Sequence, residues 1–113
     1  MEGGNSPKHS APSVRAGEVA RFDALAAQWW DPDGPMAPLH AMNPARIGWI
    51  VARLRARHPA LAGLRLLDVG CGAGLAAEAL AREGLDVLGI DAAGAAIEAA
   101  RAHAAGQGLA LAY

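Results

Sequence analysis

The chain has 113 residues, a formal net charge of −1 with neutral histidines, and a single cysteine. This length allows at most one domain, one cysteine excludes an internal disulfide, and the near-neutral charge argues against the clustered basic face of nucleic-acid-binding proteins. No apolar run is long enough for a transmembrane helix and the first residues show no secretory signal, so we expect a cytoplasmic protein.

The first part of the chain predicts a tail and a helix. Residues 1–13, rich in Gly, Ser, Pro and Asn, predict a disordered tail. From residue 14 to Trp30, apolar residues recur at the spacing of one helix face. These residues are Val19, Phe22, Ala26 and Trp29. The run Asp31–Pro35, with its prolines and glycine, ends this helix in a loop.

A second helix is predicted after the loop, which Pro38 prolongs. Asn43 is a preferred N-cap residue and Pro44 a preferred first helical residue, so the helix is expected to begin there. Its apolar stripe consists of Ile47, Ile50, Val51 and Leu54. The helix is expected to end at His58, because a residue before proline avoids the α conformation. Residues 14–58 thus predict a helical cap.

Residues 59–113 predict strands that alternate with helices. The strands are expected at 64–69, 86–90 and 109–113, and the helices at 75–83 and 92–105. This alternation is typical of βαβ units, which build a parallel sheet. Such a sheet needs helices on both faces, and two crossover helices cannot supply them. We therefore expect an incomplete α/β domain that ends where its third strand begins.

A glycine-rich segment, Gly70-Cys71-Gly72-Ala73-Gly74, lies between the first predicted strand and the helix after it. Glycines let the backbone turn tightly and approach a ligand closely, and the loop N–H groups and the helix N-terminus offer hydrogen-bond donors. Asp68 and Asp91 end two neighbouring strands, at the edge where open α/β sheets bind ligands. An acid at the position of Asp91 accepts hydrogen bonds from ribose hydroxyls in nucleotide-binding folds. Cys71 is expected to fill the turn as a small buried residue.

The glycine spacing favours S-adenosylmethionine over NAD as the ligand. Dinucleotide folds prefer G-x-G-x-x-G, which leads a pyrophosphate onto the helix N-terminus, whereas this loop has glycines at 70, 72 and 74 followed by Leu75. The Asp68 carboxylate is an awkward neighbour for a pyrophosphate and suits the amino group of a methionine moiety. The alternatives are an NAD-dependent oxidoreductase, and a plain strand-to-helix turn with Asp91 as a helix cap.

Four segments carry a resemblance to a known family. Leu67–Gly74 and Gly89–Asp91 resemble the first and second motifs of class I methyltransferases. Upstream, Phe22–Asp31 contains Trp-Trp-Asp, and Pro38–Arg46 contains Leu-His-x-x-Asn-Pro-x-Arg. Both segments resemble the N-terminal part of the ubiquinone biosynthesis O-methyltransferase family. The resemblance runs from about Val14 to Tyr113.

The resemblance implies a Rossmann-like class I methyltransferase fold, of which this chain holds the N-terminal helices and the first βαβαβ. It implies methyl transfer from S-adenosylmethionine to a phenolic hydroxyl of a polyprenylated ubiquinone precursor, such as a demethylubiquinol or a polyprenyl hydroxyphenol. It also implies cofactor contacts for Arg46, Gly70 and Asp91, and a guanidinium suits the methionine carboxylate. The full set of predicted cofactor-binding residues is Arg46, Asp68, Gly70, Gly72, Gly74 and Asp91.

Members of the family are about twice as long as this chain, so we expect the catalytic residues beyond Tyr113. A non-catalytic, truncated cofactor-binding or interaction module is therefore a further hypothesis. No metal site is expected, because the four histidines show no ligand spacing with Cys71. The expected partners are a polyprenylated phenol or quinol and, through peripheral contact, the inner face of the membrane or a ubiquinone-biosynthesis complex. No nucleic acid is expected.

Overall fold

A computed structural model describes the backbone of residues 11–113 and the side chains from residue 17 onward. The helices are α1 (Ala11–Trp29), α2 (Ala37–Arg55), α3 (Leu75–Arg82) and α4 (Gly94–Ala104). The strands are β1 (Arg65–Val69), β2 (Asp86–Ile90) and β3 (Leu111–Ala112). The first helix thus starts inside the predicted tail, the rest of which lies outside the described residues.

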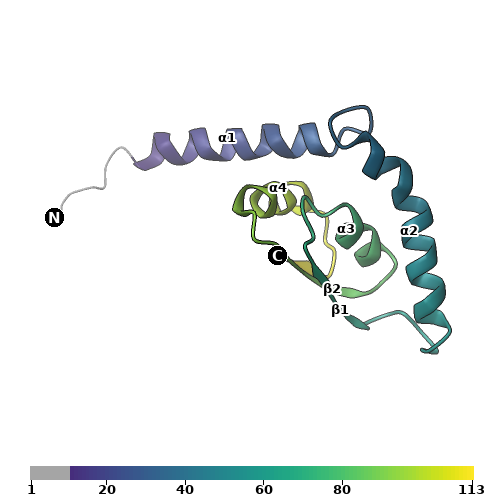
Figure 1. Cartoon of the computed structure of the whole chain (residues 1–113). Helices are drawn as coiled ribbons and strands as arrows, with labels where there is room; N and C mark the ends of the chain where they lie inside the picture. The colour runs from purple at the N-terminus through teal and green to yellow at the C-terminus, as the bar shows by residue number, and fades with distance from the viewer. Residues whose placement is uncertain (1–10) are drawn as a thin grey trace.

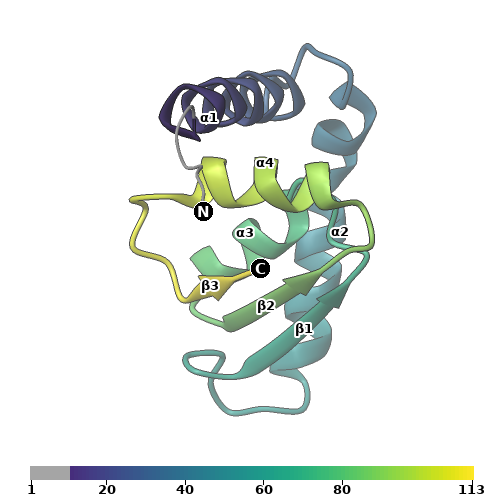
Figure 2. The same cartoon turned by 90° about the vertical axis from the view of Figure 1, so that its left-hand side faces the viewer.

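The three strands form one parallel sheet in the order β1-β2-β3 (Figure 2). Leu67 of β1 lies opposite Leu88 of β2, and Val87 of β2 lies opposite Leu111 of β3. A parallel pair needs a crossover connection, and α3 and α4 provide the two crossovers. The βαβαβ order predicted from the sequence is confirmed, and β2 has the predicted bounds.

The hydrophobic core lies between the helices and one face of the sheet. Its buried members come from α2, α3, β2 and the segments beside them. They are Ile47, Leu61, Ala77, Leu80, Ala81, Leu85 and Val87. Around this core, α2 packs against α3 and α1 lies across α4 (Figure 1). Of the stripe predicted on α1, Ala26 is buried, whereas Val19 is exposed.

The other face of the sheet carries exposed apolar side chains. Leu67 and Val69 of β1 and Leu88 and Ile90 of β2 are all exposed, Val69 by 71%. Alternate strand residues point to opposite faces, so these four share the face opposite to the core. Parallel sheets are normally covered on both faces. Within the described residues this second cover is missing, as expected for an incomplete α/β fold.

The predicted start of α2 is wrong. The helix begins at Ala37 after Met36, with Pro38 in its first turn, and it continues through Pro44. Proline is tolerated in a first turn, because its missing N–H would have no intrahelical partner there. Pro38 therefore opens the helix instead of prolonging the loop. Asn43 lies inside the helix and caps nothing, so its side chain is available for other contacts.

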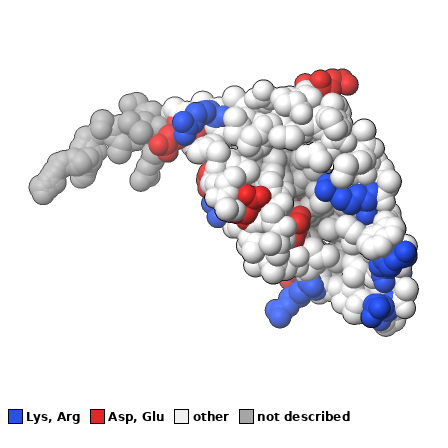
Figure 3. Space-filling model, viewed as in Figure 1, with Lys and Arg blue, Asp and Glu red and all other residues white. Residues whose placement is uncertain are grey.

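The outer face of α2 exposes an aromatic residue beside arginines. Trp49 is 59% exposed, and the guanidinium carbon of Arg53 lies 4.5 Å from the centroid of its ring. Basic side chains gather along the α2 side in the space-filling view (Figure 3). In the part of the chain from residue 11 onward, no helix is both long and apolar enough to cross a membrane.

We expect Leu85→Ala to lower the free energy of unfolding by about 2–5 kcal/mol, because it opens a cavity in the core. Leu85 is 1% exposed. The matched control is Leu88→Ala, which removes the same atoms from a side chain that is 46% exposed and should change stability far less. Urea denaturation of both variants measures the difference. Equal losses would contradict the position of the core.

Candidate cofactor site

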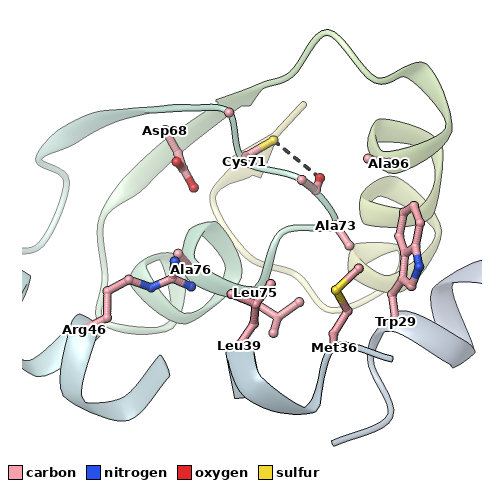
Figure 4. Close-up of a pocket in the computed structure, with 12 residues that line it drawn as sticks. Trp29, Met36, Leu39, Arg46, Asp68, Cys71, Ala73, Leu75, Ala76 and Ala96 are labelled. Carbon is pink, nitrogen blue, oxygen red and sulfur yellow. Dashed lines mark hydrogen bonds between the residues drawn. The ribbon is translucent and has the colours of Figure 1, made fainter. Parts of the chain in front are cut away.

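A pocket of about 300 Å³ lies between the start of α2 and the glycine loop (Figure 4). Trp29, Met36 and Leu39 line it from the N-terminal helices, and the glycine loop with the first turn of α3 lines it from the sheet side. The charged residues that line this pocket are Arg46 and Asp68. The rest of its lining is apolar side chain or backbone.

The glycine loop is held against the end of β2 by its own backbone. Gly70 and Cys71 donate their N–H groups to the Ile90 carbonyl, at 2.8 and 3.0 Å. Gly72 donates its N–H to Oδ2 of Asp91 at 2.8 Å. These three donors are therefore used inside the protein. For these three N–H groups, the expectation that the loop offers donors to a ligand is wrong, because Ile90 and Asp91 already accept their hydrogen bonds.

The second carboxylate oxygen of Asp91 is also engaged. Oδ1 accepts a hydrogen bond from the Ala93 N–H at 2.8 Å, so one side chain joins the glycine loop to the turn before α4. The two bonds, from Ala93 and from Gly72, lower the pKa of Asp91 below its ordinary value. Asp91 is not among the residues that line the pocket. Each carboxylate oxygen has two lone pairs and retains one for a further donor.

The glycines of the loop have different surroundings. Gly70 and Gly72 have φ angles of +76° and +57°, and a Cβ at either would meet nothing within 4 Å. Both residues line the pocket. Gly74 has a φ of +93°, and a Cβ there would overlap the hydroxyl of Tyr113. Gly74 thus makes room for the Tyr113 ring and does not line the pocket.

Arg46 and Asp68 reach the pocket from opposite sides (Figure 4). They form no ion pair with each other in the described part of the chain. Burial raises the pKa of the Asp68 carboxyl, the Arg46 guanidinium partly offsets this rise, and the charge of Asp91 adds to it. Nη2 of Arg46 donates to Oδ1 of Asn43 at 2.6 Å, while its buried Nε has no partner among the described residues.

Cys71 is buried in the loop, as predicted. Burial raises the pKa of its thiol, and the nearby carboxylates of Asp68 and Asp91 raise it further. A thiol with a raised pKa is a poor nucleophile, so the environment of Cys71 suits packing. Among residues 11–113, no group of three or more His, Cys, Asp or Glu side chains is arranged to hold a metal ion.

The N-terminal segment is attached to the loop by Trp30. Its indole Nε1 donates to the Ala73 carbonyl at 3.0 Å. Its ring stacks on His103 of α4, with centroids 3.7 Å apart and planes 2° from parallel. His103 in turn hydrogen-bonds Glu78 of α3 at 2.7 Å, and Glu78 is 1% exposed. The sequence marks Trp30 by its tryptophan neighbour, but nothing local marks His103 or Glu78.

The structure thus brings Arg46, Asp68, Gly70 and Gly72 together at one pocket. Gly74 lies against Tyr113, and Asp91 lies behind the loop as its anchor. Asn43, which contacts Arg46, was missed as a site residue. Its position one helical turn before Arg46 is the sequence signal that places the two on the same helix face.

A glycine loop between a parallel strand and a helix, with an acid after the next strand, is the arrangement of a nucleotide- or cofactor-binding α/β domain. Residues 66–113 match the family model described as a methyltransferase domain. Over these residues the chain is similar to methyltransferase domains.

Curated relatives agree with the family that the sequence resembles. Ubiquinone biosynthesis O-methyltransferase from Azorhizobium caulinodans is 50% identical over 109 residues, which cover 89% of this chain and 43% of the relative. The proteins of that name from Sinorhizobium medicae and Pectobacterium carotovorum are 49% and 43% identical, over 89% and 94% of this chain and 44% and 43% of their own lengths. The resemblance to this family is confirmed, and the chain spans less than half the length of these relatives.

We expect Gly74→Ala to lower the free energy of unfolding by about 2–4 kcal/mol, from left-handed backbone strain and overlap with Tyr113. The control is Gly63→Ala. Gly63 has a φ of +79°, and a Cβ added there would meet nothing within 4 Å, so that variant has the strain alone. Thermal and urea unfolding compare the two. Equal destabilisation would show that Tyr113 does not occupy the space beside Gly74.

The lowered pKa of Asp91 predicts that the free energy of unfolding depends on pH. Its pKa is lower in the folded state, so its contribution is present above the ordinary carboxyl pKa of about 4 and is lost as pH falls below it. Asp91→Asn should be less stable than the wild type at pH 7, and the gap should narrow as the pH falls below about 4 and through the lowered folded-state pKa of Asp91. Urea midpoints across this range test it, with Asp86→Asn, an exposed acid at the start of β2, as the control. A gap that is independent of pH would refute the role of the carboxylate.

Proposed function

We propose that the protein is an S-adenosylmethionine-dependent O-methyltransferase that acts on a phenolic hydroxyl of a polyprenylated ubiquinone precursor, such as a demethylubiquinol or a polyprenyl hydroxyphenol. The reaction and pathway are those in the names of the curated relatives. The observation that carries the proposal for the cofactor is the placement of Arg46 and Asp68 at one pocket.

A cation and an anion at one pocket fit a zwitterion. The amino-acid end of S-adenosylmethionine has a carboxylate and an ammonium group. The unpartnered Nε of Arg46 is a buried donor, and leaving such a donor unsatisfied costs about 1–3 kcal/mol. A ligand carboxylate would satisfy it. An ammonium group beside Asp68 would likewise favour the ionised carboxylate that burial disfavours.

Three N–H groups of the glycine loop are already hydrogen-bonded within the protein, which argues against a dinucleotide as the ligand. A pyrophosphate needs backbone N–H groups directed at its oxygens, and those of Gly70, Cys71 and Gly72 are bonded to the end of β2. The Asp68 carboxylate would also repel it. S-adenosylmethionine carries no phosphate, so it does not need free N–H groups from these three residues. These two features favour S-adenosylmethionine over a dinucleotide at this pocket.

The remaining parts of the pocket suit the rest of the cofactor. Gly70 and Gly72 leave open space beside the loop for the adenosyl group. Asp91 does not line this pocket, but each of its carboxylate oxygens keeps a lone pair that could accept a hydrogen bond from a ribose hydroxyl. Met36 and Leu39 supply apolar side chains to the pocket wall. When bound, S-adenosylmethionine supplies the methyl group, and these residues would hold it in line for a phenolic oxygen.

The same proposal covers location and partners. A polyprenylated phenol or quinol resides in a membrane, so the protein must meet its substrate at the membrane surface. The exposed Trp49, with Arg53 over its ring, is a pairing suited to a lipid interface. We place the protein in the cytoplasm, in peripheral contact with the inner face of the membrane or with a ubiquinone-biosynthesis complex.

Calorimetric titration of the intact protein with S-adenosylmethionine and with NADH tests the cofactor. We expect saturable binding of S-adenosylmethionine alone. Arg46→Ala and Asp68→Asn should each weaken it by about ten- to a hundredfold, the range for a hydrogen bond to a charged group. Arg57→Ala, which removes an exposed guanidinium outside the pocket, is the control.

The substrate is tested by transfer of labelled methyl from S-adenosylmethionine to a demethylubiquinol or a polyprenyl hydroxyphenol. Labelled product with either ring supports the proposal. Binding of NADH without S-adenosylmethionine, or tight cofactor binding with no transfer to either ring by the intact protein, would overturn it.

A further inference from the structure

The side-chain amide of Asn43 makes two hydrogen bonds, one to α3 and one within α2. Nδ2 donates to the carbonyl of Leu75, the first residue of α3, at 3.1 Å. Oδ1 accepts the hydrogen bond from Nη2 of Arg46 at 2.6 Å. A carbonyl can only accept and a guanidinium can only donate, so these two partners fix the orientation of the amide.

The contact restrains the guanidinium of Arg46. Asn43 and Arg46 are three residues apart in α2, so both side chains lie on the same face of the helix. A guanidinium is a planar fork, and a bond at Nη2 limits its rotation about the end of the side chain. Nε remains buried and unpartnered in the described chain. The guanidinium is thus held at Nη2, while its Nε is a donor without a partner among the described residues.

The contact also connects the guanidinium to the glycine loop. Leu75 directly follows Gly74, so its carbonyl lies where the loop becomes α3. Through Asn43, the position of Arg46 is tied to that of the loop which lines the other side of the pocket. A shift of α2 along α3 would break this connection.

We propose that Asn43 is a positioning residue, which holds the Arg46 guanidinium in the orientation that binds the carboxylate of an amino-acid ligand. This inference rests on the proposed function, since the ligand concerned is S-adenosylmethionine. Asn43 does not contact the ligand; it acts through Arg46. Its contribution therefore applies to ligands that carry the carboxylate and not to ligands that lack it.

A purely structural role gives a different expectation. Trp30 also donates from the N-terminal segment to a carbonyl beside the loop, that of Ala73, but it has no bond to Arg46. If Asn43 served only to attach α2 to the loop, its loss would resemble the loss of Trp30. Both would then affect every ligand of the pocket alike.

The test is calorimetric titration of the intact protein with two ligands. S-adenosylmethionine carries the amino-acid carboxylate, and methylthioadenosine lacks the whole amino-acid end. Asn43→Leu keeps most of the volume of Asn43 and removes both hydrogen bonds. We expect about tenfold weaker binding of S-adenosylmethionine, the loss of one hydrogen bond to a charged group, and unchanged binding of methylthioadenosine. Unchanged binding of methylthioadenosine also shows that the variant is folded.

Two controls complete the design. Trp30→Phe should shift the affinities for both ligands by the same factor. In the Arg46→Ala background, Asn43→Leu should cause no further loss for S-adenosylmethionine, because the group that it positions is gone. Should Asn43→Leu be unfolded, Asn43→Ala carries the same expectation with a smaller side chain.

The outcomes separate the two proposals. Equal weakening of both ligands by Asn43→Leu, or losses that add to those of Arg46→Ala, would overturn the role of Asn43 and leave the cofactor assignment standing. If the wild type bound neither ligand, the proposed function would fail and this inference with it.

Discussion

The glycine loop is fixed by three hydrogen bonds to the end of β2, and the site depends on them. Gly70 and Cys71 donate to the Ile90 carbonyl, and Gly72 donates to Asp91. These bonds hold the loop, which follows β1, against the end of β2 and the residue after it, so the pocket has a fixed wall before any ligand arrives. They also decide which ligand chemistry the wall can serve, because N–H groups bonded to the sheet are not free to bind phosphate.

The N-terminal helices are positioned by that fixed loop. Trp30 bonds to it and stacks on His103, which reaches the buried carboxylate of Glu78. Glu78 also accepts a hydrogen bond from Arg82 at 3.0 Å. A buried carboxylate needs such partners, and here they connect α3 to α4 and, through the indole, to the end of α1. The helical cap and the sheet therefore share one polar network beside the pocket.

Local signals predicted the parts of the fold that depend on short segments. The β2 strand and the glycine loop were predicted because alternating apolar residues and glycines specify them directly. The start of α2 was missed, since Pro38 suits a loop and a first helical turn equally well. Arg46 and Asp68 were predicted for the site and lie at it. The displacement of Gly74 from the pocket was not predictable, because it depends on where the Tyr113 ring packs.

The contacts that bind the helical cap to the loop end on backbone carbonyls, those of Ala73 and Leu75. A backbone acceptor is present whatever side chain its residue carries, so the constraint on sequence falls on the donors. Positions 73 and 75 are free to vary within the limits of their burial, whereas Trp30 and Asn43 have few substitutes of matching reach. The loop and the cap can therefore diverge at different rates while the joint between them keeps its geometry.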